Sequence, residues 1–566
     1  MSKISFFALG GLGEVGKNMY VLEINQDIFV LDCGSALPGG QVFGYDSIIP
    51  DFSYLLDNID RVRGLFLSHF RQKNIGGFIR IAKDLKVPYY VSDYTFKAIE
   101  SWYLPLMAQE EKEGLDFKII NKEDILEFGE TKVEFFTLSS SVPDTFGFAF
   151  KVNVSEEEDK IIYKNIVYLP DFNFDQNLKR HFRINFKKIN KIADEGVLVL
   201  LTPSSGANSV GHITTDDNLD AALHKLMAHQ GRDYIIMDAE NVSGMLQVID
   251  AVEFQKRQIT IIGAKARRLV EIAMELGYAV KDPQYYIEKQ LLTDDIRNSQ
   301  NTVIIIAGEQ TEAFFALQRI ATFQDPHYYL TANDNVTFLM SISKKYEKIL
   351  ASSWDNIWLN NTNLIDFDVN LMPETKCGPE DLKLLYSLMS PKYIIPISGD
   401  YRMLKAQEEI AKKYGFCEKH IIRLDNGLVA TFENQDYILD YELIETGDIL
   451  FGGESDSDIN DYVAREREAL TSEGFLVISG MINLKERKIY KDIEMVSYGF
   501  LPEFGQEEVI KEIKEKFKEI VNEYLEYKKV DYKELRQELK NEISKLITKI
   551  TRKRPILIPA IIDISN

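Results

Sequence analysis

Residues 8–23 read ALGGLGEVGKNMYVLE, and this glycine-rich stretch decides the fold. Its first half contains residues 11–16, GLGEVG, which match the GxGxxG pattern of dinucleotide-binding loops. That pattern holds a pyrophosphate only when a helix follows at once, because the amides at the helix N-terminus bind the phosphates. Residues 18–23 are strand-like instead, and the polar turn at residues 25–27 leads into a second strand. The stretch therefore predicts a glycine-rich β-hairpin and argues against a nucleotide site.

Short runs rich in β-branched and aromatic residues predict strands through the first two hundred positions. The clearest runs are residues 4–9, 19–24, 28–31, 65–68, 148–152, 166–169 and 197–201. Helices and strands then alternate, with helices predicted over 217–229, 244–254 and 267–276 and strands over 234–237, 259–262 and 303–306. This alternation predicts a small parallel-sheet domain inserted into the first domain, which a strand at 394–396 and a helix at 404–414 then close.

The last part of the chain differs in composition and in its pattern of predicted helices and strands. Residues 447–461, GDILFGGESDSDIND, are rich in Gly, Ser and Asp and predict a linker. Beyond them, residues 475–483 and 488–497 predict paired strands, and residues 556–564 predict a final strand. A helical stripe of apolar residues runs from 509 to 524. The pattern indicates a small α+β domain.

The composition is that of an ordinary globular protein: 566 residues, 45% hydrophobic and 27% charged, enough for about two to four domains. The three cysteines, Cys33, Cys377 and Cys417, form no CxxC pair and fit a reducing compartment. The N-terminus lacks the features of a signal peptide, and no apolar run approaches the roughly 20 residues that span a membrane. We therefore expect a cytoplasmic protein with no membrane partner. The net charge of −22 argues against bulk attraction to nucleic acid and leaves a local basic groove as the route to RNA.

Motifs spread over nearly the whole chain resemble those of one family. They are the opening stretch at 8–23, LDCG at 31–34, IPDFSYL at 49–55, FNFDQ at 172–176, EDLK at 380–383, GDYR at 399–402 and KRP at 553–555. These residues are similar to ribonuclease J proteins, which are metallo-β-lactamase nucleases with an inserted β-CASP domain that cleave RNA with a two-zinc centre. The resemblance implies an α/β fold, a metallo-β-lactamase αββα sandwich with an inserted β-CASP α/β domain and a small α+β C-terminal domain.

The resemblance also implies a domain organisation. The metallo-β-lactamase domain is expected in two pieces, residues 1–209 and 350–446, and the β-CASP domain between them at 210–349. The linker at 447–461 then leads to a C-terminal α+β oligomerisation domain at 462–566.

The zinc-binding signature of that family, H-x-H-x-D-H after a strand, is mostly missing here. The corresponding residues 68–74 read SHFRQKN, in which only His69 is a family ligand. Arg71 stands at the second histidine position, Lys73 at the aspartate position and Asn74 at the last histidine position. Arginine and protonated lysine have no free lone pair, so these side chains repel a zinc ion.

The remaining ligand positions of the family agree with this loss. Two further histidine positions align with Ser140 and Ser398, whereas the bridging aspartate is kept as Asp171. The chain has seven histidines, and none forms an HxH or HExxH pair. We therefore predict no catalytic residue and no cofactor, or at most one weakly held divalent ion at His69 and Asp171.

Three functions remain open. The leading one is a catalytically inactive partner of an active ribonuclease J paralogue in RNA decay and rRNA processing; because the family assembles as dimers and tetramers, the resemblance implies a homo- or hetero-oligomer. The second is an RNA-binding regulator in which Arg71 and Lys73 contact RNA phosphates; the simpler alternative is that both form ion pairs with Asp171. The third is a weak metal-dependent 5′-3′ exo- and endoribonuclease with a reduced metal site at His69 and Asp171.

Overall fold

The structure is a computed structural model. It describes residues 2–37, 47–157, 160–175, 178, 180–209, 219–229, 231–280, 282–288, 293–342, 347–372, 376–438, 442–451, 470, 473–500, 507–527 and 530–565. The chain forms two compact units, one of Met1–Ala36 with Ile49–Asp448 and one of Leu37–Ile48 with Ile449–Asn566. Among the described residues, no helix combines the length and the apolar run needed to cross a membrane.

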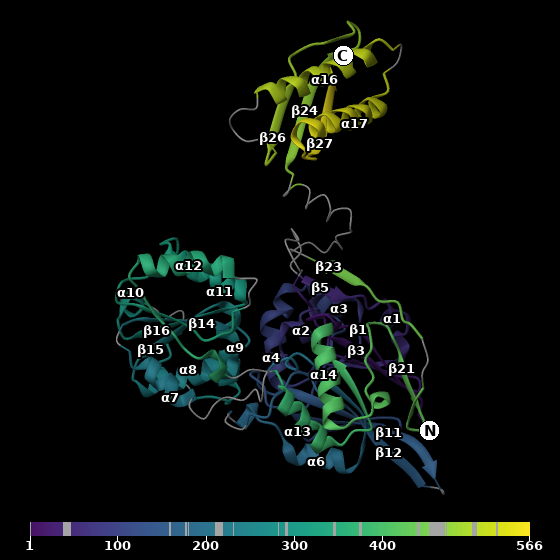
Figure 1. Cartoon of the computed structure of the whole chain (residues 1–566), viewed down its shortest axis with the longest axis vertical. Coiled ribbons are helices and arrows are strands. Elements are labelled where there is room, and N and C mark those ends of the chain that lie inside the picture. The colour runs from purple at the N-terminus through teal and green to yellow at the C-terminus, as the bar shows by residue number, and fades with distance from the viewer. Residues whose placement is uncertain are drawn as a thin grey trace. The chain divides into compact units, whose positions relative to one another are not determined.

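The first unit contains two large sheets (Figure 1). In sheet order, the eight-stranded sheet consists of β22 (Asp436–Ile438), β21 (Ala430–Glu433), β1 (Ile4–Gly10), β3 (Met19–Ile24), β4 (Asp27–Leu31), β6 (Val62–Phe66), β7 (Pro88–Val91) and β8 (Asp116–Ile119). The six-stranded sheet consists of β19 (Tyr393–Ile397), β13 (Val197–Pro203), β12 (Lys160–Tyr168), β11 (Phe146–Glu157), β10 (Thr131–Thr137) and β9 (Ile125–Phe128).

The two sheets pack face to face through aromatic side chains. Phe29 and Phe150 have ring centroids 5.2 Å apart, and Phe66 and Phe148 lie 5.8 Å apart. The outer face of the six-stranded sheet is covered by α6 (Phe186–Asp194), α13 (Pro379–Met389) and α14 (Tyr401–Tyr414). The outer face of the other sheet packs against α1 (Ser53–Asp57), α3 (Phe78–Asp84) and α4 (Asp93–Trp102). This arrangement is the metallo-β-lactamase αββα sandwich, and we call it the sandwich lobe.

The inserted lobe, the described part of residues 219–365, is built on one parallel sheet (Figure 1). Its strands in sheet order are β15 (Gln258–Ile262), β16 (Thr302–Gly308), β14 (Asp233–Asp238), β17 (Asn335–Phe338) and β18 (Asn363–Ile365). Its helices are α7 (Leu219–Met227), α8 (Val242–Phe254), α9 (Ala264–Glu275), α10 (Asp294–Asn298), α11 (Gln310–Ala321) and α12 (Glu347–Leu359). The predicted parallel-sheet domain is thereby confirmed. Residues 210–218, where the helix prediction began, lie outside the described residues.

Short elements complete the first unit and its border. They are β2 (Leu12–Gly13), β5 (Ser47–Pro50), β20 (Gly399–Asp400), β23 (Asp448–Phe451), α2 (Gln72–Ile75), α5 (Gln109–Lys112) and the 3-10 turns Ile59–Arg61, Leu104–Leu106, Arg180–Phe182, Val369–Leu371 and Glu418–His420. The GxGxxG stretch runs through β2 into β3 with no helix after it, so the hairpin interpretation is confirmed. The predicted linker begins with β23, and its residues 452–461 lie outside the described residues.

The second unit is a small sheet covered by helices on one face. Its central strand β24 (Phe475–Asn483) pairs antiparallel with β25 (Lys488–Ile489) and β26 (Glu494–Tyr498) and parallel with β27 (Ile556–Asp563). Leu476, Ile478 and Ile482 of β24 are buried under α16 (Glu507–Leu525) and α17 (Tyr532–Thr551). The strand predicted at 488–497 is therefore two separate strands.

Candidate functional site

Four polar residues lie at one edge of the six-stranded sheet because they follow strands that run in the same direction. β12, β13 and β19 are parallel, and β10 and β12 are each antiparallel to β11. The carboxyl ends of parallel strands meet at the same sheet edge, where ligands bind in many α/β proteins. Ser140 follows β10, Asp171 follows β12, Ser205 follows β13 and Ser398 follows β19.

The second contribution comes from residues 68–74, which follow β6 of the facing sheet. Asp32 anchors this loop: its carboxylate accepts hydrogen bonds from the Ser68 amide (2.8 Å), the Ser68 hydroxyl (2.8 Å) and Asn74 Nδ2 (2.6 Å). The loop also lies close to Gly34, where a Cβ atom would come within 1.7 Å of the Lys73 carbonyl oxygen. The LDCG turn therefore admits only glycine at its last position.

His69 is fully buried and presents a bare ring nitrogen to the site. Because the Ser68 hydroxyl donates its proton to Asp32, His69 Nδ1 must donate to Ser68 Oγ, 2.9 Å away. Nε2 then carries a lone pair, and it has no hydrogen-bond partner among the described residues. Burial, with the Arg71 and Lys73 cations, lowers the pKa of His69 well below its usual value. The neutral imidazole is an acceptor.

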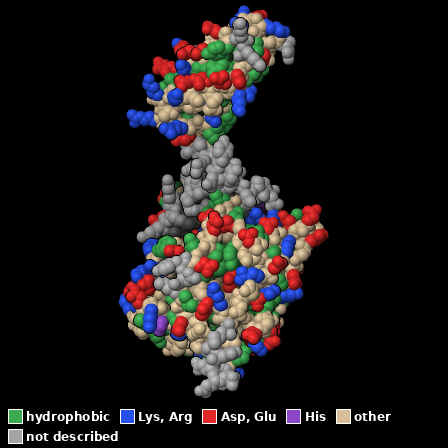
Figure 2. Space-filling model, turned by 90° about the vertical axis from the view of Figure 1, so that its right-hand side faces the viewer, with side chains coloured by type: hydrophobic (Ala, Val, Ile, Leu, Met, Phe, Trp, Pro, Cys, Tyr) green, Lys and Arg blue, Asp and Glu red, His purple; other side chains and the backbone are tan. Residues whose placement is uncertain are grey.

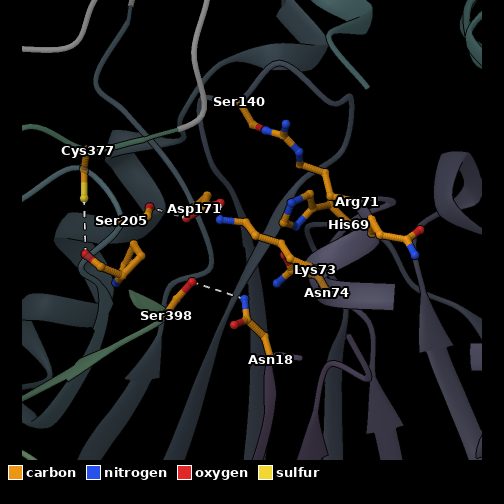
Figure 3. Close-up of polar contacts among 12 residues, drawn as sticks. Asn18, His69, Arg71, Lys73, Asn74, Ser140, Asp171, Ser205, Cys377 and Ser398 are labelled. Atoms are coloured by element: carbon orange, nitrogen blue, oxygen red, sulfur yellow. Dashed lines mark hydrogen bonds and ion pairs between the residues drawn. The ribbon is translucent and has the colours of Figure 1, made fainter. Parts of the chain in front are cut away.

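Lys73 lies at the centre of the site (Figure 3). Its ammonium nitrogen forms an ion pair with Oδ2 of the buried Asp171, whose Oδ1 accepts a 2.9 Å hydrogen bond from the Ser205 hydroxyl. Burial, together with the Arg71 and Lys376 cations, lowers the pKa of Lys73. The contact with the Asp171 carboxylate acts against this shift, because an opposite charge favours the ammonium form.

Arg71 does not pair with Asp171, and that part of the ion-pair expectation is wrong. In Figure 3 the Arg71 side chain reaches toward Ser140, whereas the Lys73 side chain reaches Asp171. Arg71 Nε donates to Oε2 of Glu240 at 3.2 Å, and a terminal nitrogen of Arg71 lies 3.9 Å from Oδ2 of Asp238. Glu240 belongs to the inserted lobe. Arg71 therefore connects the two lobes, whereas Lys73 forms its ion pair within the sandwich lobe.

The two serines at former histidine positions bind neighbouring groups of the protein. Ser140 Oγ accepts from the Val142 amide at 3.2 Å, and Ser398 Oγ accepts from Nδ2 of Asn18 at 3.2 Å. Both serines are buried. Their hydroxyls therefore stabilise the loops that carry them.

The donor set does not fit the two-zinc centre that the resemblance implies. Zinc requires imidazole nitrogens, thiolates or carboxylates converging on the ion. Here His69 and Asp171 provide such groups, but the Lys73 ammonium occupies the position beside the Asp171 carboxylate. Within the described ranges, no three His, Cys, Asp or Glu side chains form a group that could hold a metal ion. No step of a metal-dependent reaction follows from these residues.

Sequence reasoning missed Glu240 and Lys265, which complete the charged network around Arg71. Lys265 Nζ donates to Glu240 Oε1 at 2.9 Å and lies 3.8 Å from Glu309. Glu240, Lys265 and Glu309 lie shortly after the ends of β14, β15 and β16, three parallel strands of the inserted lobe. The signal that could have identified them in the sequence was the presence of acidic and basic residues at the ends of predicted strands.

Two family models match the chain. One is described as "Ribonuclease J, beta-CASP domain" and matches residues 230–344; the other is "Ribonuclease J C-terminal domain" and matches residues 462–564. Proteins named Ribonuclease J 2 from Staphylococcus epidermidis and Staphylococcus aureus are each 29% identical to this chain, covering 99% of it and 98% of the relative. Among solved structures, a protein of unknown function from Enterococcus faecalis V583 has a TM-score of 0.49 at 13% identity, covering 76% of this chain and 100% of that one.

Proposed function

Since the chain belongs to the ribonuclease J family, we propose that it serves RNA processing and decay as a non-catalytic subunit that works through an active ribonuclease J paralogue. The observation that carries the proposal is the ion pair between Lys73 and Asp171. A metal ion lowers the pKa of a bound water so that it can attack a phosphodiester. A lysine ammonium carries charge to the same place but cannot bind and activate a water in this way.

The partner role is supported by the face of the second unit's sheet that points away from α16 and α17. Side chains alternate along β24, so Phe475, Val477 and Met481 point away from α16 and α17. In register with them are Val496 and Tyr498 of β26 and Ile558 and Ile562 of β27, between 48% and 64% exposed. The result is a largely apolar face, interrupted by the paired Ser479 and Glu494, and exposed apolar patches of this kind often mark interaction sites.

The occupant we propose for this face is the same face of a paralogue or of a second copy. The match of the C-terminal family model indicates that a ribonuclease J partner carries a comparable domain. Two such sheets can pack face to face about 10 Å apart, as in a β-sandwich. Because each chain carries a net charge of −22, two copies approach each other most easily through uncharged surfaces.

RNA contact by Arg71 and Lys73 receives less support, because carboxylates already hold both side chains. On the face shown in Figure 2, lysine and arginine side chains are interspersed with acidic ones and form no basic band. The intact chain is therefore proposed to bind RNA weakly on its own.

The test is degradation of a 5′-monophosphorylated RNA by the purified protein, titrated with manganese and zinc, beside an Asp171→Ala variant. No turnover, or equal turnover in both proteins, is the expected result. Turnover that disappears in Asp171→Ala would overturn the proposal and indicate a reduced metal site at His69 and Asp171. Addition of the active paralogue then tests whether the chain changes the paralogue's rate.

A further inference from the structure

The Glu240 carboxylate is held by donors from both lobes of the first unit. Its Oε1 accepts from the Gln72 main-chain amide at 2.9 Å and from Lys265 Nζ at 2.9 Å. Its Oε2 accepts from Arg71 Nε at 3.2 Å. Glu240 is only 7% exposed, and the Arg71 and Lys265 side chains are 18% and 12% exposed. One buried anion therefore satisfies three donors that come from two separate segments of chain.

These donors are the types that bind phosphate groups in proteins. A guanidinium and an ammonium supply charge-assisted hydrogen bonds, and a main-chain amide adds a directed donor. The set is preorganised, because the Gln72 amide belongs to the loop that Asp32 anchors and Lys265 lies in the first turn of α9. Lys265 also lies over the Phe70 ring, 5.9 Å from its centroid.

The acceptor, Glu240, lies on a different segment of the chain from its three donors. Glu240 lies in the short connection between β14 and α8, so a shift of that connection would withdraw the carboxylate while the three donors stay in place. The other two acidic residues nearby are peripheral: Asp238 is 3.9 Å from Arg71, and Glu309 is 3.8 Å from Lys265. Among the described residues, Glu240 alone makes close contacts with all three donors.

We propose that Arg71, Lys265 and the Gln72 amide form a phosphate-binding site in which Glu240 is the resident internal anion. The ligand class is a phosphate group, supplied either by the backbone of RNA or by a free phosphate. Any such ligand must displace Glu240, because the Glu240 carboxylate already accepts the hydrogen bonds of Arg71 Nε, Lys265 Nζ and the Gln72 amide. The intact protein is thus self-inhibited for anion binding. This inference goes beyond the proposed function and holds whether or not the chain is a nuclease.

The first test uses the full chain and inorganic phosphate. Glu240→Ala removes the internal anion and leaves space, so phosphate at constant ionic strength should raise the thermal unfolding midpoint of this variant in a saturable manner. The wild type and the matched control Glu309→Ala should respond at least about tenfold more weakly, because Glu240 still fills the site. Adding Arg71→Ala to Glu240→Ala should abolish the response. Equal responses of wild type, Glu240→Ala and Glu309→Ala would overturn the proposal.

The second test covers the case in which Glu240→Ala does not fold. Glu240→Gln keeps the shape and removes the charge, and its affinity for a fluorescent single-stranded RNA should be about tenfold higher than that of the wild type. The slope of log affinity against log salt should steepen by about 0.7 for each phosphate newly contacted. Unchanged RNA affinity and slope, together with no rise in the thermal unfolding midpoint of Glu240→Gln in phosphate, would overturn the proposal. Phosphate binding by Glu240→Ala without tighter RNA binding by Glu240→Gln would support a site for free phosphate.

Discussion

The ammonium group of Lys73 forms an ion pair with the carboxylate of Asp171, which is almost completely buried. One partner lies in α2 beside the eight-stranded sheet, and the other follows β12 of the six-stranded sheet. The pair therefore connects the two sheets at the edge where the functional residues gather.

Removal of Lys73 should destabilise the protein strongly. Lys73→Ala leaves the Asp171 carboxylate buried without its cation, which typically costs about 3–5 kcal/mol of the free energy of unfolding. Lys132→Ala, which breaks an exposed ion pair with Glu127, is the matched control and should have no measurable effect. Urea denaturation measures both. A double variant, Lys73→Ala with Asp171→Ala, should recover part of the loss; no recovery would mean that the ion pair is not the cause.

The stability contributed by Glu240 should depend on pH. Burial alone would raise the pKa of Glu240, but the Lys265 and Arg71 cations lower it from 4.5 to about 2. A lowered carboxyl pKa contributes stability that is complete above the unfolded value and is lost as the pH falls toward the folded value. Glu240→Gln should therefore lower the free energy of unfolding at pH 7 by on the order of 3 kcal/mol, since a tenfold change in proton affinity corresponds to about 1.4 kcal/mol.

Urea denaturation over a pH series measures this contribution. The difference between wild type and Glu240→Gln should be largest above about pH 5 and should shrink as the pH falls toward about 2. Glu309→Gln serves as the control, because burial raises the pKa of Glu309 and its contribution changes with pH in the opposite direction. A difference for Glu240→Gln that grows toward acid would contradict the assignment.

The sequence predicted the fold better than the contacts of the site. The bounds of β3 and β24 match the predicted ranges. The alternation of apolar and polar residues, with glycines between the elements, was sufficient there because this pattern indicates which face of an element is buried. α17 was missed because its buried Leu535, Leu539, Ile543 and Ile547 recur only every fourth residue and form a narrow stripe among charged side chains.

The same limit explains the error at Arg71. The pattern of residues 68–74 showed which ligand types had been replaced, but not which anions the new cations would meet. The partner, Glu240, bonds to the neighbouring Gln72 from 168 residues further along the chain. Such a pairing depends on how the two lobes pack, and no local periodicity carries that information.

A single substitution should create a metal site. In Lys73→Asp, a new carboxylate joins Asp171 and the bare Nε2 of His69, which gives three ligands of the kinds that zinc and manganese bind. Saturating zinc should raise the thermal unfolding midpoint by about 5 °C or more in this variant and should not raise it in the wild type. Lys73→Asn is the matched control, because it removes the cation without adding a charge. An equal rise in both variants would show that zinc binds elsewhere.

The apolar face of the second unit should control assembly. Val477 of β24 pairs with Val496 of β26 on one side and Ile558 of β27 on the other, so it lies at the centre of the face. The double variant Val477→Glu with Ile558→Glu would place charges inside any sheet-to-sheet contact, which is unfavourable. Light scattering should therefore give the mass of a single chain for the variant. The wild type should give the mass of a dimer or of a complex with its paralogue. Trp358→Glu replaces an exposed apolar residue of the inserted lobe and should leave assembly intact. Assembly that persists with both glutamates present would place the interface elsewhere.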